Sequence, residues 1–153
     1  MTTTTLKETL RADLTAAIKS SDKLTAGTIR MALSAITNEE VAGAVARQLS
    51  DAEVVTVLAR EQKKRREAAE AFQAAGRTAQ AEQERAEGEV LATYLPKQLT
   101  DEELAELVRA AVAESGATGP REMGLVMKVL TPKIAGRAEG GRVAAAVKGA
   151  LSS

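Results

Sequence analysis

Apolar residues recur along the chain at helical spacing, and no stretch alternates between apolar and polar residues as a β-strand does. One aliphatic residue stands at every fourth position from Leu6 to Ile18, which places this series on one face of a helix. A second series from Ile29 to Ile36 predicts another helix, which we expect to extend to about Ala46. The chain is therefore expected to begin with two amphipathic helices.

Capping residues mark where the next two helices begin and end. Ser50 and Glu53 have the spacing of a capping box, in which each side chain accepts a hydrogen bond from the backbone N–H of the other residue. This box opens a third helix that ends at Gly76, and Thr78 starts a fourth helix that Pro96 terminates. The long N-terminal part of the chain is thus predicted to be helical throughout.

Beyond Pro96 the pattern predicts three more helices. Residues 96–99 resemble a short linker, and Thr100 with Glu103 forms a further capping box. The predicted helices run from this box to Ser115–Gly116, from Thr118–Gly119–Pro120 to a break at Pro132 and Gly136, and from Gly140–Gly141 onward. We therefore expect an all-α protein of two helical units: a long-helix N-terminal unit, residues 1–95, and a three-helix C-terminal unit, residues 96–153.

The composition of the 153 residues excludes several kinds of chemistry. The chain has no histidine and no cysteine, which excludes a thiolate nucleophile, a Ser-His-Asp triad, a structural zinc site and a disulfide. One tyrosine and one phenylalanine cannot form a platform on which RNA bases stack. No acid–base pair stands out among the carboxylates, so we expect no catalytic residues, no metal and no other cofactor.

The hydropathy of the chain argues against a membrane protein. No apolar run approaches the roughly 18 to 20 residues that a membrane span requires. Met1 is followed by four threonines rather than by the basic start and apolar stretch of a signal peptide. We therefore expect a soluble, cytoplasmic protein with no membrane partner.

The charges balance overall but are unevenly distributed. Residues 96–119 carry two basic and five acidic side chains, whereas residues 120–153 carry six basic and two acidic ones. A small basic module can bind an RNA backbone through shape and charge, without aromatic stacking. The candidate phosphate contacts are Lys128, Lys133, Arg137, Arg142 and Lys148. The alternative is a tight glycine turn between two helices with ordinary exposed charges, since no glycine pattern matches a nucleotide phosphate loop.

A second basic cluster, Lys63-Lys64-Arg65-Arg66, lies in the predicted third helix. Four consecutive residues point around most of a helix, so they do not form one patch. Arg65 is seven residues from both Leu58 and Phe72, which places it on the apolar stripe, and Glu61 has the spacing to pair with it. One interpretation is an arginine whose charge is paired by Glu61 on a partly covered helix face. The other is a polar site between the helices or between the two units. For Lys63, Lys64 and Arg66, a solvated helix surface is the preferred interpretation.

Several motifs in order along the chain resemble the YqeY-like family. They are Asp22-Lys23, Ile29-Arg30-Met31, Ser34-Ala35-Ile36, Asn38-Glu39, Gln62-Lys63-Lys64-Arg65-Arg66-Glu67, Ala75-Gly76-Arg77, Tyr94-Leu95-Pro96-Lys97-Gln98-Leu99, Met123-Gly124, Val126-Met127-Lys128, Pro132-Lys133 and Gly136-Arg137-Ala138. The resemblance implies two helical domains with a boundary near Pro96. It also implies that the C-terminal module is similar to the tail domain of GatB, a subunit of the tRNA-dependent amidotransferase, and that it contacts tRNA.

The resemblance leaves two functions open. The first is a non-catalytic, tRNA-associated protein related to the amidotransferase, with the basic C-terminal residues as phosphate contacts. The second is a protein-interaction module, an accessory of the amidotransferase subunits that docks through the long N-terminal helices without binding RNA. The family label also implies carbon–nitrogen ligase activity with glutamine as nitrogen donor, but no amidase Ser/Lys machinery or ATP site is visible in this sequence.

Overall fold

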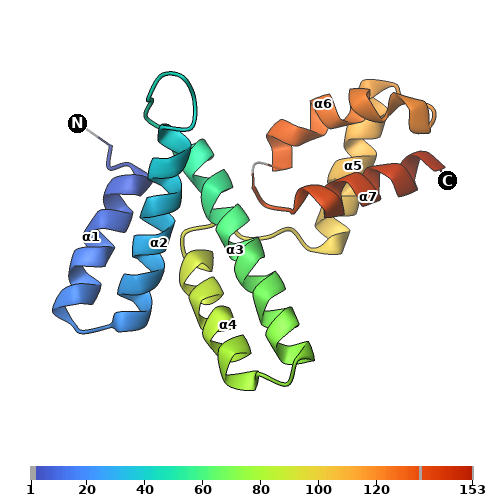
Figure 1. Ribbon diagram of the computed structural model, residues 1–153. Coiled ribbons are helices and arrows are strands. Elements are labelled where there is room, and N and C mark those ends of the chain that lie inside the picture. Colours follow the sequence, from blue (N-terminus) through green and yellow to red (C-terminus); the bar gives the residue numbers. More distant parts are fainter. Residues whose placement is uncertain (1–2, 135, 153) are drawn as a thin grey trace. The chain divides into compact units, whose positions relative to one another are not determined.

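The computed structural model describes residues 3–134 and 136–152, and it divides the chain into two compact units, Met1–Leu95 and Pro96–Ser153. All regular secondary structure in the described residues is helical, which confirms the predicted all-α fold (Figure 1). Within that same part of the chain, every helix is too short or too polar to cross a bilayer.

The N-terminal unit consists of two helix pairs. Its helices are α1 (Leu6–Lys19), α2 (Lys23–Glu40), α3 (Asp51–Ala74) and α4 (Thr78–Ala92). Helix α1 packs on α2 and α3 packs on α4, while α2 also contacts α3 and α4 (Figure 1). The apolar stripes predicted from the sequence meet in one core, in which Leu10, Ile29, Ile36, Leu58 and Leu91 are almost completely buried.

Side-chain caps fix the start of the first three helices. Thr5 accepts a hydrogen bond from the backbone N–H of Glu8, and Asp22 accepts one from that of Thr25. The predicted capping box of Ser50 is present in full at the start of α3. Because each cap satisfies a backbone N–H that has no partner within the helix, these positions could be identified from the sequence.

The second helix ends earlier than predicted, at Glu40 rather than near Ala46. The Glu40 carboxylate accepts hydrogen bonds from Lys7 Nζ at 2.7 Å and from the backbone N–H of Leu49 at 3.2 Å. The backbone N–H of Arg47 bonds to the Glu40 carbonyl at 3.0 Å. These bonds hold residues 41–50 as a loop, so tertiary partners overcome the helix propensity of its alanines.

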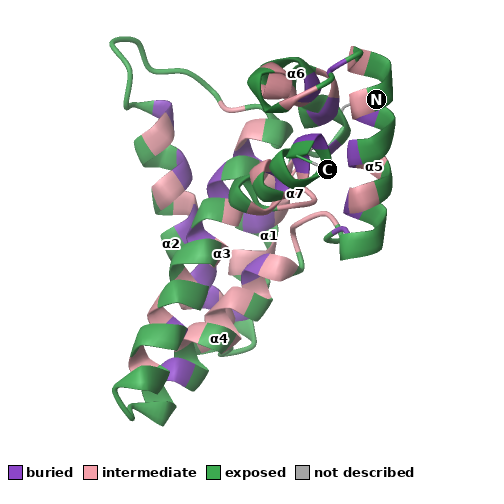
Figure 2. Ribbon diagram, turned by 90° about the vertical axis from the view of Figure 1, so that its right-hand side faces the viewer, coloured by how far each residue is buried: buried purple, intermediate pink, exposed green. Residues whose placement is uncertain are grey.

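The C-terminal unit packs three helices around its own core. Its elements are α5 (Asp101–Ser115), a 3₁₀ turn η1 (Pro120–Glu122), α6 (Met123–Ile134) and α7 (Gly140–Ser152). Each α-helix contributes an aliphatic stripe to this core, and the buried positions turn inward on all three (Figure 2). Its largest fully buried side chains are those of Leu130, Val108, Val126 and Val147.

Pro132 does not break the chain, contrary to the prediction, but lies inside α6, which continues to Ile134. A proline in the last turn removes one backbone hydrogen bond and leaves the preceding turns intact. Leu130 and Ile134 are both buried, and their burial favours continuation of the helix. The break comes at Gly136, whose φ of +80° lies in the left-handed region that favours glycine.

Candidate nucleic-acid interface

The five candidate phosphate contacts lie on α6, α7 and the segment between them. Lys128 and Lys133 belong to α6, Arg137 follows its end, and Arg142 and Lys148 belong to α7. The fold thus brings together on two neighbouring helices residues that span 21 positions in sequence. Their surroundings differ, and the five do not form one uniform set.

Arg142 holds the linker that enters the C-terminal unit. Its Nη2 donates hydrogen bonds to the carbonyl of Leu99 at 2.8 Å and to a carboxylate oxygen of Asp101 at 2.9 Å. The backbone N–H of Leu99 bonds to the carbonyl of Arg137 at 2.8 Å. Both backbone polar groups of the buried Leu99 are therefore satisfied: its carbonyl by the Arg142 side chain and its N–H by the Arg137 carbonyl.

The Arg137 side chain is half-buried and faces acidic residues. It lines a small cavity of about 250 Å³ together with Leu99, Glu103, Glu106 and Leu107. Hydrogen bonds from Thr100 lower the pKa of Glu103, and the positive charges of Lys97 and Arg137 lower it further. The local role of Arg137 is therefore to balance the carboxylates of α5.

The three lysines are exposed, and only one of them has an ion pair. Lys133 Nζ lies 2.8 Å from Glu114 Oε2, and both side chains are largely open to solvent. Such a surface pair contributes little stability. Lys128 and Lys148 are exposed and make no ion pair with the described part of the chain. These two lysines are therefore accessible to an external partner.

Two further arginines of this unit were not selected from the sequence. Arg121 is exposed on η1, and Arg109 is exposed on α5, where it lines a groove of about 590 Å³ between α5 and α7. Neither makes an ion pair with the residues that the structure describes. Arg121 contributes to the positive charge counted for residues 120–153, but the sequence did not indicate that it precedes α6 in phase with Lys128.

Acidic residues dominate α5. This helix carries Asp101, Glu102, Glu103, Glu106 and Glu114, with Arg109 as its one basic residue. The α6–α7 segment carries the opposite sign. Two carboxylates of α5 pair with cations of this segment, Asp101 with Arg142 and Glu114 with Lys133.

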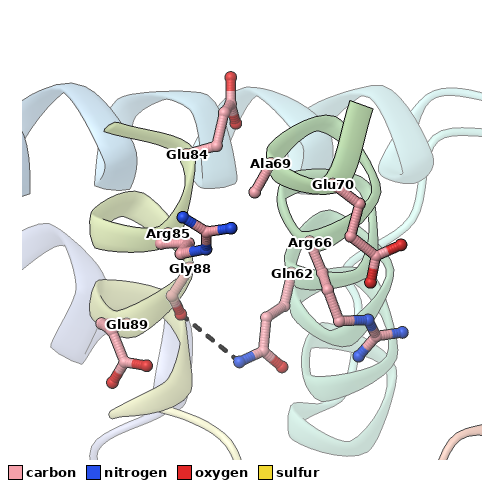
Figure 3. Close-up of a pocket in the computed structure, with 8 residues that line it drawn as sticks. All are labelled: Gln62, Arg66, Ala69, Glu70, Glu84, Arg85, Gly88 and Glu89. Carbon is pink, nitrogen blue, oxygen red and sulfur yellow. Dashed lines mark hydrogen bonds between the residues drawn. The ribbon is translucent and has the colours of Figure 1, made fainter. Parts of the chain in front are cut away.

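The second basic cluster is dispersed around α3, as its spacing predicted. Lys64 Nζ pairs with Glu61 Oε2 at 3.0 Å, while Lys63 and Arg66 each have a partner of their own. Arg66 also lines a cavity of about 340 Å³ between α3 and α4 (Figure 3). The cavity contains both charge signs, so it does not favour a polyanion.

Arg65 is enclosed between helices, but its partner is not the one predicted. Its Nε lies 3.2 Å from Glu87 and 3.8 Å from Glu84, both on α4. The expected pairing with Glu61 is wrong, because α4 passes close to Arg65 at Gly88, where an added Cβ would be 3.8 Å from the Arg65 Cβ. A close approach of another helix is a tertiary feature that i to i+4 spacing does not contain.

A family model described as Yqey-like protein matches residues 7–151. The chain belongs to the Yqey-like family. No curated protein matches it. The family match spans both helical units and includes every motif on which the resemblance rests.

The part of this Yqey-like protein that the structure describes has no cluster of metal-binding side chains. Residues 3–134 and 136–152 contain no group of three or more His, Cys, Asp or Glu side chains placed to hold a metal ion.

Proposed function

We propose that this Yqey-like protein is a non-catalytic, tRNA-associated protein related to the tRNA-dependent amidotransferase. Residues 96–153 act as its GatB-tail-like domain and contact tRNA. The observation that supports this is the polarity of the unit: unpaired cations on α6 and α7, and carboxylates on α5. Exposed cations attract a phosphate backbone, and carboxylates repel it.

Among the five candidates, Lys128 and Lys148 are the principal phosphate contacts. Both are exposed and free of ion pairs within the described residues. Lys133 contributes after exchanging its exposed partner Glu114, which costs little. Arg137 and Arg142 act chiefly by holding the linker at Leu99 and neutralising the carboxylates of α5. They are therefore positioning residues rather than principal phosphate contacts.

Mobility shift with total tRNA at two salt concentrations tests the proposal. Binding weakens as salt rises, because each phosphate contact releases bound counterions. The double variant Lys128→Gln/Lys148→Gln lowers the affinity and reduces the slope of log affinity against log salt by about two. The matched control is Lys19→Gln/Lys23→Gln, which removes two exposed lysines from the N-terminal unit. Absence of any shift at micromolar protein in low salt contradicts the proposal.

A protein-interaction role has one observation in its favour. The loop 41–50 exposes Val41 and Val45, whose exposed fractions are 58% and 78%. Exposed apolar residues grouped in one loop are a feature of protein-binding surfaces. Capture of an amidotransferase subunit that survives RNase, and that is lost on Val41→Ser/Val45→Ser, supports this second function. Capture that RNase abolishes favours the first.

A further inference from the structure

The outer face of α6 carries a line of exposed residues with no role in the core. Val126, Leu130 and Ile134 form the inner face and are buried. Gly124 and Lys128 are each two residues from a buried one, so they point the other way, and both are exposed. Arg121 lies in the 3₁₀ turn that leads directly into α6 and stands three residues before Gly124, so it lies near the same face of the helix.

This line places a glycine between two unpaired cations. Arg121 and Lys128 make no ion pair within the described residues. Seven residues separate them, which is about 11 Å along the helix axis, so together they span more than one phosphate of a nucleic-acid strand. Gly124 leaves the backbone uncovered at the centre of this span.

Nothing inside the fold requires a glycine at position 124. A Cβ added there would meet no atom within 4 Å, and the residue does not have a positive φ. Glycine is unfavourable in a helix relative to alanine. A residue that weakens its own helix and that packing does not require is consistent with close approach of an external partner.

The neighbouring Leu125 indicates that the partner is not purely ionic. Its exposed fraction is 49%, which makes it one of the more exposed large hydrophobic residues of the chain. It stands beside Gly124, on the side of α6 that faces away from the core. A ribose offers both an apolar face and a neighbouring phosphate, so it matches an aliphatic side chain flanked by cations.

The lack of aromatic residues in this unit favours paired RNA over single strands. Residues 96–153 contain no Phe, Tyr or Trp. Sequence-tolerant binding of single strands depends on stacking bases on aromatic rings. Paired RNA is instead recognised through its backbone, its 2′-hydroxyls and its shape.

We infer that the outer face of α6, with Gly124 between Arg121 and Lys128, lies against the ribose–phosphate backbone of a base-paired RNA stem. The inference rests on the proposed function, since it names the surface and the RNA structure through which tRNA is contacted. Arg121 and Lys128 bind phosphates, Gly124 permits close approach, and Leu125 contacts ribose.

A steric substitution at Gly124 tests the inference without harming the fold. Gly124 is exposed, and a Cβ added there meets no protein atom within 4 Å, so Gly124→Gln leaves thermal stability the same or raises it. Its affinity for a blunt RNA duplex and for total tRNA falls about fivefold or more, and Gly124→Ala has a smaller effect. The double variant Arg121→Gln/Lys128→Gln lowers the salt slope by about two.

Helix α2 provides a matched control. Gly27 also has no atom within 4 Å of an added Cβ, and it lies between the exposed Lys23 and Arg30. It differs in being half-buried and in lying in the N-terminal unit. Gly27→Gln leaves the affinity for the RNA duplex unchanged.

The outcomes separate the inference from the proposed function. Failure of the unaltered protein to bind total tRNA overturns both. Retained tRNA binding with an unaffected Gly124→Gln variant overturns the inference alone. The inference is also overturned if an unpaired strand of the same length, or heparin, binds as tightly as the RNA duplex. Loss of duplex binding in Gly27→Gln overturns it as well. Duplex-selective binding that Gly124→Gln weakens, with stability intact, supports both.

Discussion

The hydroxyl of Tyr94 donates a hydrogen bond of 2.5 Å to a carboxylate oxygen of Asp13, although the two residues are 81 positions apart. The bond joins α1 to the turn that follows α4, so it closes the N-terminal unit just before the chain leaves it. Burial raises the pKa of Tyr94, and the hydrogen bond to Asp13 and its negative charge raise it further. The hydroxyl therefore stays protonated beyond the usual range of tyrosine.

Replacing Tyr94 with phenylalanine should lower the free energy of unfolding by about 1–3 kcal/mol, because Asp13 loses a partner in a partly buried place. Urea unfolding measures this change. Since the folded-state pKa is raised, the contribution is complete below the ordinary pKa of tyrosine and is lost as the pH rises. The chain has one tyrosine and no tryptophan, so tyrosinate absorbance reports Tyr94 alone. Native-state titration in the ordinary range near pH 10 would contradict the expectation.

Local signals in the sequence account for the helices but not for their partners. The capping boxes at Ser50 and Thr100 are present because a cap depends on residues three apart. The loop after Glu40 was missed because Lys7, from another helix, helps hold it. Similarly, α4 supplies the partners of Arg65, and helical spacing has no information about which helix lies opposite.

The positive charge of the candidate surface was predictable from the sequence, but the individual contacts of its cations were not. The excess of basic residues in positions 120–153 follows from counting. Which cations lack a partner depends on tertiary contacts, such as the bonds of Arg142 to Leu99 and Asp101. Arg121 was not selected because helical spacing in the sequence did not indicate the 3₁₀ turn that carries Arg121 into α6.

Arg65 should act as a structural residue. Its side chain is 15% exposed and contacts the carboxylates of Glu84 and Glu87, so Arg65→Met removes a cation from both of them. We expect a loss of about 1–3 kcal/mol in the free energy of unfolding. The double variant Arg65→Met/Glu87→Gln should lose less than the sum of the two single variants, because the carboxylate is then also removed.

The same Arg65 variant separates folding from RNA binding. At a temperature where Arg65→Met is fully folded, mobility shift should give the same tRNA affinity as the unaltered protein. The control is Lys128→Gln, which should weaken tRNA binding without changing the urea midpoint, because Lys128 is exposed. A selective loss of tRNA affinity in Arg65→Met would assign the second basic cluster a role in the interface.

A side chain at Gly116 should lower the free energy of unfolding, in contrast to one at Gly27. It follows α5 with φ of +73°, in the left-handed conformation that often ends a helix. Gly116→Ala should lower the free energy of unfolding by about 1–2 kcal/mol through backbone strain alone, since nothing lies within 4 Å of the added Cβ. Gly27→Ala, in α2, should raise it by about 0.5–1 kcal/mol. Equal effects of the two substitutions would contradict this reading.

The N-terminal unit should lose stability in acid through two glutamates around the loop 41–50. A hydrogen bond from Arg47 is the main cause that lowers the pKa of Glu53 to about 2, and one from Lys7 is the main cause that lowers the pKa of Glu40. Because both folded-state values are depressed, their stabilisation is present above the ordinary value of 4.5 and is lost as pH falls toward about 2.

Thermal unfolding measured at intervals between pH 5 and pH 2 checks this dependence. In Glu53→Gln the decline in melting temperature over that window should be shallower, while the capping box persists because glutamine also fits its third position. The control is Glu102→Gln, which alters an exposed glutamate of the C-terminal unit. If Glu53→Gln and Glu102→Gln flatten the acid limb equally, the loop contacts of Glu53 do not set the acid sensitivity. A flattening specific to Glu53→Gln attributes that sensitivity to the contacts of the Glu53 carboxylate with Arg47 and Ser50.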